Sequence, residues 1–363
     1  MRQLVAVVLA CAGSAAALGW DAPGHRVITT IALERLSPDA PAWLREPERR
    51  DGIIWQSAEP DRWRGLRSNF LMHENAPDHF LDIEDLEHYG LTLETIPPLR
   101  YQYVAAMAVA RHEHPRGLTG NLKPHNPKLD QAGQQEWPGF LPHAIMEHYA
   151  RLTSQFRTVR ILEQLNEPAR AAQLVMARDN VAVTMGLLSH FVGDAAQPLH
   201  TTRHFNGWVD DEGKAWKDNP YGFTAARTFH AYIDGGVLKL HGLADAAALR
   251  GQATGAPPEI KTGEEWPATL AYIGRSFERV RPLYELEKTG GLKKDEGKAF
   301  IRACLTDAGA MLGALYNAAW KASEPSAKDV ADFVRYDGFG KTEGEVEEAG
   351  TNPPAPPAVE GGQ

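Results

Sequence analysis

Two histidines and an aspartate occur close together in the segment from Leu187 to His200. His190 and Asp194 are four residues apart within an apolar pattern of helical period, so a helix would place both side chains on one face. Pro198 is expected to end that helix, and His200 can then fold back beside the same face. Two imidazoles and a carboxylate that converge suit a cation such as zinc, which accepts nitrogen and oxygen ligands.

The spacing of His190 and Asp194 is not specific by itself, because the chain contains fourteen histidines. It has three His-x-x-x-Asp pairs, of which at least one is expected to be coincidental. They are His190/Asp194, His230/Asp234 and His241/Asp245.

Further residues with metal-ligating side chains lie upstream. His79 precedes Asp82 by three residues, and Asp61 lies in a separate short segment before them. Nearer the start of the chain, the run from Trp20 to His25 adds another histidine. A metal site assembled from these residues would need several elements to converge on the predicted helix that carries His190.

The elements that would position these side chains are predicted to be helices. Apolar residues recur at helical spacing in ranges 27–36, 101–110, 144–156, 159–165, 182–191, 223–238, 269–287 and 298–322, whereas alternating patterns are scarce. Ranges 115–139 and 206–222 are rich in proline and glycine and are expected to be long loops, which are often functional. We therefore predict one large all-α, multi-helix domain over residues 20–340 that carries its site partly on loops.

Residues 1–19 have the pattern of a secretory signal peptide. Arg2 provides the positive charge, residues 4–12 form an apolar run, and Ala17-Leu18-Gly19 is a small-x-small cleavage site. The apolar run is too short for a stable membrane anchor. Cleavage after Gly19 would make Trp20 the amino terminus. Lipid attachment at Cys11 is an alternative that the preceding residues fit poorly.

The other cysteine is Cys304, so the processed chain could form no internal disulfide. Export without disulfides is more typical of a bacterial periplasm or cell exterior than of a eukaryotic secreted protein. Residues 341–363 are rich in Glu, Pro and Gly and are predicted to be a disordered tail.

The sequence resembles the zinc-dependent, single-strand-specific nucleases and 3′-nucleotidases of fungi and plants, whose all-helical fold is shared with bacterial zinc phospholipases C. Four family motifs match from Trp20 to Asp234 and in the family's order. They are Trp-x-x-x-Gly-His at 20–25, His-Phe-x-Asp at 79–82, His-Phe-x-Gly-Asp-x-x-Gln-Pro-Leu-His at 190–200, and His-x-x-x-Asp at 230–234.

The resemblance implies three zinc ions. The first would be bound by Asp61, His79, His190 and Asp194. The second would be bound by His200, His230 and Asp234. The third would be bound by the amino nitrogen and carbonyl oxygen of Trp20 together with His25 and Asp194, so that Asp194 bridges two ions. A terminal amine can lose its proton and bind metal, whereas an internal amide nitrogen does so poorly.

The resemblance also implies roles in the reaction. Asp82 would orient the attacking water or accept its proton, and Phe80 would stack on a nucleobase without regard to sequence. The family's Gly-Gly-Asn turn after the last histidine of the central motif is absent here, and a longer tryptophan-rich loop replaces it. Asn206 or Asn219 could take the place of the family's asparagine.

The remaining histidines are interpreted as surface or packing residues. The pair His241/Asp245 is interpreted as coincidental, since it lies beyond the matched region and next to Gly242. The same interpretation applies to His73, His88, His112, His114, His125, His143, His148 and His204.

The net charge of the chain, −9 at pH 7, limits the kinds of partner. Loss of Arg2 with the signal peptide would make it −10, the wrong sign for a protein that holds nucleic acid on a basic surface. Bound zinc would concentrate positive potential at the site, so the charge does not exclude a metal-dependent phosphoesterase.

These features lead to one functional expectation and two alternatives. The leading expectation is a periplasmic or secreted bacterial endonuclease for single-stranded DNA and RNA, with 3′-nucleotidase activity, no stable protein partner, and no transmembrane segment after signal cleavage. The first alternative is a zinc-dependent phospholipase C acting on phospholipid headgroups. The second is a catalytically silent binding module that zinc stabilises.

Overall fold

The computed structural model describes residues 20–66, 68–249 and 258–337, and the predicted all-α architecture is confirmed for them. Within these ranges no strand is formed, and one isolated bridge joins Val209 to Ala215. The α-helices are α1 Ala22–Glu34, α2 Pro47–Gln56, α3 Glu59–Gly65, α4 Asn69–Asn75, α5 Arg100–Glu113, α6 Leu141–Leu165, α7 Ala171–Ala196, α8 Phe229–Ala231, α9 Leu238–His241, α10 Glu265–Phe277, α11 Val280–Lys288, α12 Asp295–Ala322 and α13 Ala327–Asp337. Short helical turns are η1 Ala42–Arg45, η2 Ala76–His79, η3 Ile83–Tyr89, η4 Leu93–Thr95, η5 Pro168–Arg170, η6 Pro198–Thr201, η7 Tyr232–Val237, η8 Ala246–Leu249 and η9 Gly291–Lys293.

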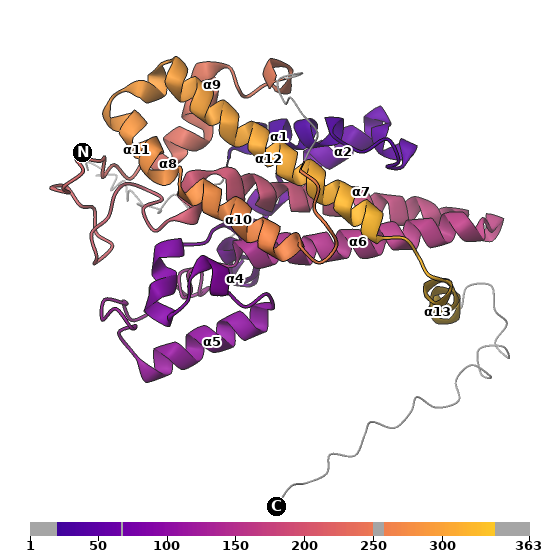
Figure 1. The fold of residues 1–363 in the computed structure, drawn as a ribbon, viewed down its shortest axis with the longest axis horizontal. Coiled ribbons are helices and arrows are strands. Elements are labelled where there is room, and N and C mark those ends of the chain that lie inside the picture. The colour runs from indigo at the N-terminus through magenta and orange to yellow at the C-terminus, as the bar shows by residue number, and fades with distance from the viewer. Residues whose placement is uncertain (1–19, 67, 250–257, 338–363) are drawn as a thin grey trace, which may run out of the picture.

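The long helices α6 and α7 lie side by side through the middle of the molecule, and α12 and α10 pack along them (Figure 1). The C-terminal half of α7 is buried on every side. From Gly186 to the end of the helix, Leu187 is the one residue that is partly exposed. A helix surrounded in this way can carry polar side chains only where they find partners, because an unpaired buried polar group costs free energy. Polar residues in this half of α7 are therefore candidates for a site.

Helices α1 and α2 cover another side of α7, and glycines set the close approach of these helices. A Cβ atom added at Gly186 on α7 would lie 2.3 Å from the Cβ of Gln56 on α2. At Gly309 on α12 an added Cβ would lie 2.3 Å from Cγ2 of Ile31 on α1. Both helix pairs consequently require glycine at the point of contact.

The predicted helix over 269–287 is wrong as a single element, since α10 ends at Phe277 and α11 begins at Val280. Pro282 explains the interruption, because a proline cannot bond to the carbonyl four residues earlier and its ring clashes with that carbonyl. In contrast, the two predicted helices over 144–165 form one continuous helix, α6.

The predicted helix over 223–238 begins later than expected. The side chain of Asn219 accepts a hydrogen bond from the backbone nitrogen of Phe223 and donates one to its carbonyl, at 2.9 Å each, and so holds this residue in the preceding loop. The helix starts at Phe229 and passes into the π-helical turn η7. Both predicted long loops contain no helix in the structure.

The predicted signal peptide over 1–19 and the tail over 341–363 lie outside the described residues. Among the described helices, none combines the length and the apolar character needed to span a membrane.

Candidate metal centre

The first candidate group is built on α7. His190 and Asp194 are fully buried, and Nε2 of His190 lies 3.3 Å from Oδ2 of Asp194, as the i,i+4 spacing predicts. His79, at the end of η2, brings Nδ1 to 2.9 Å from the same carboxylate oxygen and to 3.1 Å from the His190 nitrogen. Asp61 on α3 stands slightly farther out, with Oδ1 4.0 Å from His79 Nδ1 and 3.9 Å from His190 Nε2. All four predicted ligands of the first site are thus brought together.

The second candidate group lies beyond the end of α7, which stops at Ala196 before Pro198, as predicted. The turn η6 carries His200 back, so that its Nε2 is 3.0 Å from Nε2 of His230. The His230 nitrogen is 3.3 Å from Oδ2 of Asp234. Asp234 lies in η7, a π-helical turn, which is a rare conformation that often marks functional positions.

These separations are compatible with ligands that share a metal ion. With Zn–N and Zn–O bonds near 2.0–2.1 Å, two ligand atoms of a tetrahedral ion lie about 3.3–3.4 Å apart. The measured separations among the buried ligand atoms of the two groups, 2.9 to 3.3 Å, cluster just below that value.

The third candidate group involves His25 on α1. Its Nε2 lies 3.5 Å from Oδ1 of Asp194, the carboxylate oxygen that faces away from His79 and His190. His25 also groups with Asp61 and His190, and the His25 and His190 rings stack with centroids 4.0 Å apart. Gly193 makes this approach possible, because a Cβ there would lie 2.7 Å from Nδ1 of His25.

Trp20 is fully buried just before α1, where it packs against Gly24. A Cβ atom at Gly24 would lie 2.8 Å from the Cβ of Trp20. The next residue, Asp21, donates its backbone N–H to the carbonyl of Asp234 at 3.4 Å. The start of the described chain is therefore held against the second group.

The buried polar atoms of the site support a metal-binding interpretation. His25 Nε2, Asp194 Oδ1 and Asp234 Oδ2 are buried and make no hydrogen bond in the described structure. Leaving three such atoms unpaired would be costly without a ligand. Three groups of histidine and aspartate among the described residues could therefore hold metal ions, and two of these groups share His190.

The electrostatics lead to the same conclusion. Burial raises the pKa of Asp194 well above its usual value, and the nearby Asp61 raises it further. Burial likewise raises the pKa of Asp234. For the histidines, burial lowers the pKa of His190 to about 3 and that of His79 well below its usual value. Neutral imidazoles are the form that binds metal, and a cation would offset the cost of ionising the carboxyl groups.

Hydrogen bonds to the backbone orient the rings of His190 and His200. His190 Nδ1 donates to the carbonyl of Ser57 at 2.8 Å, and His200 Nδ1 donates to the carbonyl of His79 at 2.5 Å. In both rings Nε2 is then the nitrogen directed at the candidate group, which is the usual arrangement around metal-binding histidines. Asp234 is oriented in a similar way, because Gln197 Nε2 donates to its Oδ1 at 2.7 Å.

The predicted substrate-side residues Phe80 and Asp82 flank Leu81, which donates its backbone N–H to the carbonyl of His200 at 2.9 Å. This bond places the segment beside the second group. Phe80 is half-buried, and Gly139 lies against its backbone, where an added Cβ would be 2.1 Å from the Phe80 carbonyl oxygen. Burial, followed by repulsion from Asp85, raises the pKa of Asp82 well above its usual value.

The asparagines of the tryptophan-rich loop differ in their surroundings. Asn206 Oδ1 lies 3.4 Å from the backbone nitrogen of His230, so this side chain stands at the second group. Asn219 is buried and bonds to the backbone of Trp216 and Phe223, which leaves it occupied within the loop. Of the two candidates, Asn206 alone is positioned next to a predicted metal ligand.

Sequence reasoning missed Arg64, which lies on α3 three residues after Asp61. Its Nη1 is 3.5 Å from Asp61 Oδ1, and the side chain is largely buried. After burial, its charge is the next largest cause of the lowered pKa of His79. The i,i+3 spacing from Asp61 was the available signal, but no helix was predicted over this short segment, in which Pro60 lies in the first turn of α3.

The pair His241/Asp245 has no part in the site, as interpreted. His241 Nε2 bonds to the carbonyl of Leu292 at 2.7 Å, and Asp245 Oδ1 accepts a bond from the backbone of Ala247. His204, also interpreted as a packing residue, stacks on Trp208 with ring centroids 3.8 Å apart.

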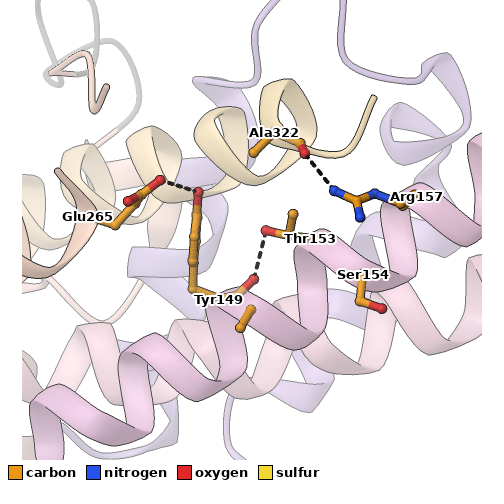
Figure 2. Close-up of a pocket in the computed structure, with 7 residues that line it drawn as sticks. Tyr149, Thr153, Ser154, Arg157, Glu265 and Ala322 are labelled. Carbon is orange, nitrogen blue, oxygen red and sulfur yellow. Dashed lines mark hydrogen bonds between the residues drawn. The ribbon is translucent and has the colours of Figure 1, made fainter. Parts of the chain in front are cut away.

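A surface hollow lies between α6, the start of α10 and the end of α12, and no predicted site residue lines it (Figure 2). Several of its polar groups are already paired. Tyr149 donates to Glu265 at 3.1 Å, and Arg157 donates to the carbonyl of Ala322 at 3.3 Å. The candidate functional site is therefore formed by the His/Asp groups and not by this hollow.

No family model matches the chain, and no curated protein matches it significantly.

Proposed function

We propose that this protein is a zinc-dependent phosphoesterase that hydrolyses single-stranded DNA and RNA and also removes phosphate from 3′-nucleotides. The observation that carries the proposal is the position of Asp194. Its Oδ2 faces His79 and His190, whereas its Oδ1 faces His25, as expected for a carboxylate that bridges two metal ions.

The donor set favours zinc over the common alkaline-earth ions. Imidazole nitrogens make up more than half of the side-chain ligands proposed, and calcium and magnesium prefer oxygen ligands. Zinc accepts both nitrogen and carboxylate oxygen and is usually tetrahedral, with a position left open in catalytic sites. In the third site we propose that the Trp20 amine, freed by signal cleavage, binds zinc together with His25 and Asp194. Because the signal peptide is removed during export, the active enzyme would lie outside the cytoplasm.

When bound, zinc lowers the pKa of water towards neutrality and neutralises charge on the phosphoryl oxygens. The chain's own residues would supply the remaining functions. Arg64 would hold a phosphate oxygen through its guanidinium group. Asp82 would orient the attacking water or accept its proton, and burial raises the pKa of its carboxyl group, which makes the carboxylate a stronger base.

A nucleic-acid substrate is supported by the residues beside the second group. Phe80 is only half-buried and can offer a ring face to a nucleobase. Asn206, at the backbone of His230, would hydrogen-bond to the substrate beside the same group.

Metal analysis and parallel substrate assays test the proposal. Processed protein should contain close to three zinc ions per chain, and a chelator should abolish hydrolysis. The substrates are single-stranded DNA, RNA, 3′-AMP and phosphatidylcholine vesicles. Turnover of lipid alone would identify a phospholipase C, and three zinc ions without turnover of any substrate would identify a binding module. One zinc ion or none in fully loaded protein would contradict the metal assignment.

A further inference from the structure

An exposed tryptophan stands beside the metal centre, on the last turn of α2. Trp55 has 55% of its surface open to solvent, although it is one of the largest apolar side chains. Two guanidinium groups lie over its ring, that of Arg62 at 4.4 Å and that of Arg26 at 5.7 Å from the ring centroid. The three side chains come from three different helices, α1, α2 and α3.

The cluster lies close to the candidate metal centre in the fold. Arg26 follows His25 in the chain, and Arg62 follows Asp61. His25 and Asp61 belong to one candidate metal group with His190. The carbonyl of Ser57, two residues after Trp55, accepts a hydrogen bond from His190, so the chain that carries Trp55 also contacts this group.

The two arginines are held differently. Arg62 donates to Glu59 at 2.7 Å and to the carbonyl of Trp55 at 3.0 Å, so it is fixed in place against the ring. Arg26 has no ion-pair partner among the described residues and is only half-buried. One guanidinium group therefore supports the indole, and the other is available to an anion.

We propose that Trp55, Arg26 and Arg62 form a second nucleotide subsite, which binds a part of the single strand outside the phosphodiester that is hydrolysed. A base stacks on the exposed indole, and Arg26 contacts a neighbouring phosphate. An exposed aromatic ring combined with basic side chains is the common way to bind single strands without sequence preference. The inference rests on the proposed function, because it requires a single-stranded nucleic acid at the metal centre.

The test compares a strand long enough to reach both subsites with a mononucleotide that reaches only the metal centre. We would measure KM and kcat of the zinc-loaded protein for a decamer of deoxythymidine and for 3′-AMP. In parallel, fluorescence anisotropy would measure binding of a labelled decamer with phosphorothioate linkages. The variants are Trp55→Ala, Trp55→Phe and Arg26→Gln. The control is Tyr101→Ala, a more exposed aromatic residue at the start of α5.

We expect Trp55→Ala to weaken decamer binding and to raise the KM for the decamer by roughly 5- to 100-fold, while the KM for 3′-AMP stays unchanged. Trp55→Phe should restore most of the decamer binding. Arg26→Gln should weaken decamer binding and reduce its salt dependence. Decamer binding unchanged in Trp55→Ala, in a protein that still cleaves the decamer, would overturn the subsite and leave the proposed function intact. If the wild-type protein neither binds nor cleaves nucleic acid, both proposals fall.

A lipid surface is the competing partner for an exposed tryptophan, so vesicles of phosphatidylcholine and phosphatidylglycerol form the last arm of the test. Trp55→Ala protein that loses vesicle binding but keeps decamer binding would assign the cluster to membranes and overturn the subsite. Circular dichroism and the melting temperature of each variant show whether it is folded. Because the side chain of Trp55 is exposed, we expect all variants to fold like the wild type.

Discussion

The Nδ1 atom of His200 lies 2.5 Å from the backbone carbonyl oxygen of His79, so a ligand of the second group is fixed by the main chain of the first. The next backbone contact, from the nitrogen of Leu81 to the carbonyl of His200, ties the same two segments together. The first and second candidate metal groups are therefore joined by backbone hydrogen bonds. A substitution that shifts the backbone of one group is expected to shift the ligands of the other.

The shared carboxylate of Asp194 gives the sharpest prediction. Asp194→Asn removes the charge that faces both His79 and His25 but keeps the side-chain volume. We expect metal content to fall from about three ions to about one, retained by the second group, and activity to fall by at least ~10³. Elemental analysis and rates on single-stranded DNA measure this. Asp245→Asn, in the coincidental pair, is the control and should change neither quantity. Three retained ions in Asp194→Asn would remove this residue from the site.

The amino terminus gives a second prediction. Protein that begins at Trp20 is compared with protein carrying one additional residue before it, which converts the terminal amine to an amide. Because amide nitrogen binds zinc poorly, we expect the extended protein to hold about one ion fewer and to lose roughly 10²–10³ in rate. His25→Ala, which removes the imidazole of the same group, should behave alike. An extended protein with full activity and a full metal complement would show Trp20 to be a packing residue only.

Gln197 is predicted to position Asp234. Its amide donates to Asp234 Oδ1 at 2.7 Å, and its own oxygen accepts from the backbone of Leu199. We expect Gln197→Met to weaken metal binding at the second group about 10- to 100-fold, as loss of a partner of a ligand typically does. Competition with a chromophoric chelator measures the affinity, and the exposed Gln102→Met serves as control. Unchanged affinity would mean that Asp234 is oriented by η7 alone.

The site could be predicted largely from sequence because its ligands lie in short motifs whose local geometry is simple. His190 and Asp194 share a face of one helix, and Pro198 ends that helix where expected. The π-helical turn at Asp234 could not be predicted, since packing against the start of the chain determines it. A Cβ at Gly235 would lie 2.0 Å from Oδ2 of Asp21, so the turn depends on a contact between residues more than two hundred positions apart.

The fold class followed from apolar periodicity, whereas helix ends depended on contacts that periodicity does not report. Pro282 separates α10 from α11, and Asn219 holds Phe223 out of the following helix. The positions of Arg64 and Trp55 near the candidate ligands likewise depend on the packing of α2 and α3 against α7 and of α2 against α1. Apolar periodicity does not predict these contacts.

The tight contact between α2 and α7 leads to a stability prediction. Gly186→Ala would place a Cβ 2.3 Å from Gln56, so we expect a loss of about 1–3 kcal/mol or more in the free energy of unfolding. Gly52→Ala is the matched control, because it lies on the solvent-facing side of α2 with no atom within 4 Å of its added Cβ. This control should be neutral or more stable by up to about 1 kcal/mol. Urea unfolding of both variants decides the matter. Equal stability would mean that the two helices can move apart at low cost.

His143 should make stability depend on pH. It is buried, its Nε2 donates to the carbonyl of Pro97 at 2.9 Å, and burial lowers its pKa to about 4. A lowered pKa means that its contribution is fully present above its unfolded value of 6.5 and is lost as the pH falls through 4. Compared with His143→Phe in chelator, wild-type protein should lose up to about 3 kcal/mol more between these pH values. The exposed His112→Phe is the control. Parallel slopes for His143→Phe and wild type would contradict the burial argument.

Cys304, the free cysteine among the described residues, is buried in α12, so the described helices are not cross-linked by sulfur. The proposed metal ligands, however, come from α1, α3, η2, α7, η6, α8 and η7. Ions bound there would act as reversible staples between distant parts of the chain, each adding about 4 kcal/mol of stability at a free concentration a thousandfold above its dissociation constant. Resistance to unfolding and proteolysis would then depend on the zinc concentration of the surroundings. In a medium without zinc the protein would lose both its activity and its resistance to proteases.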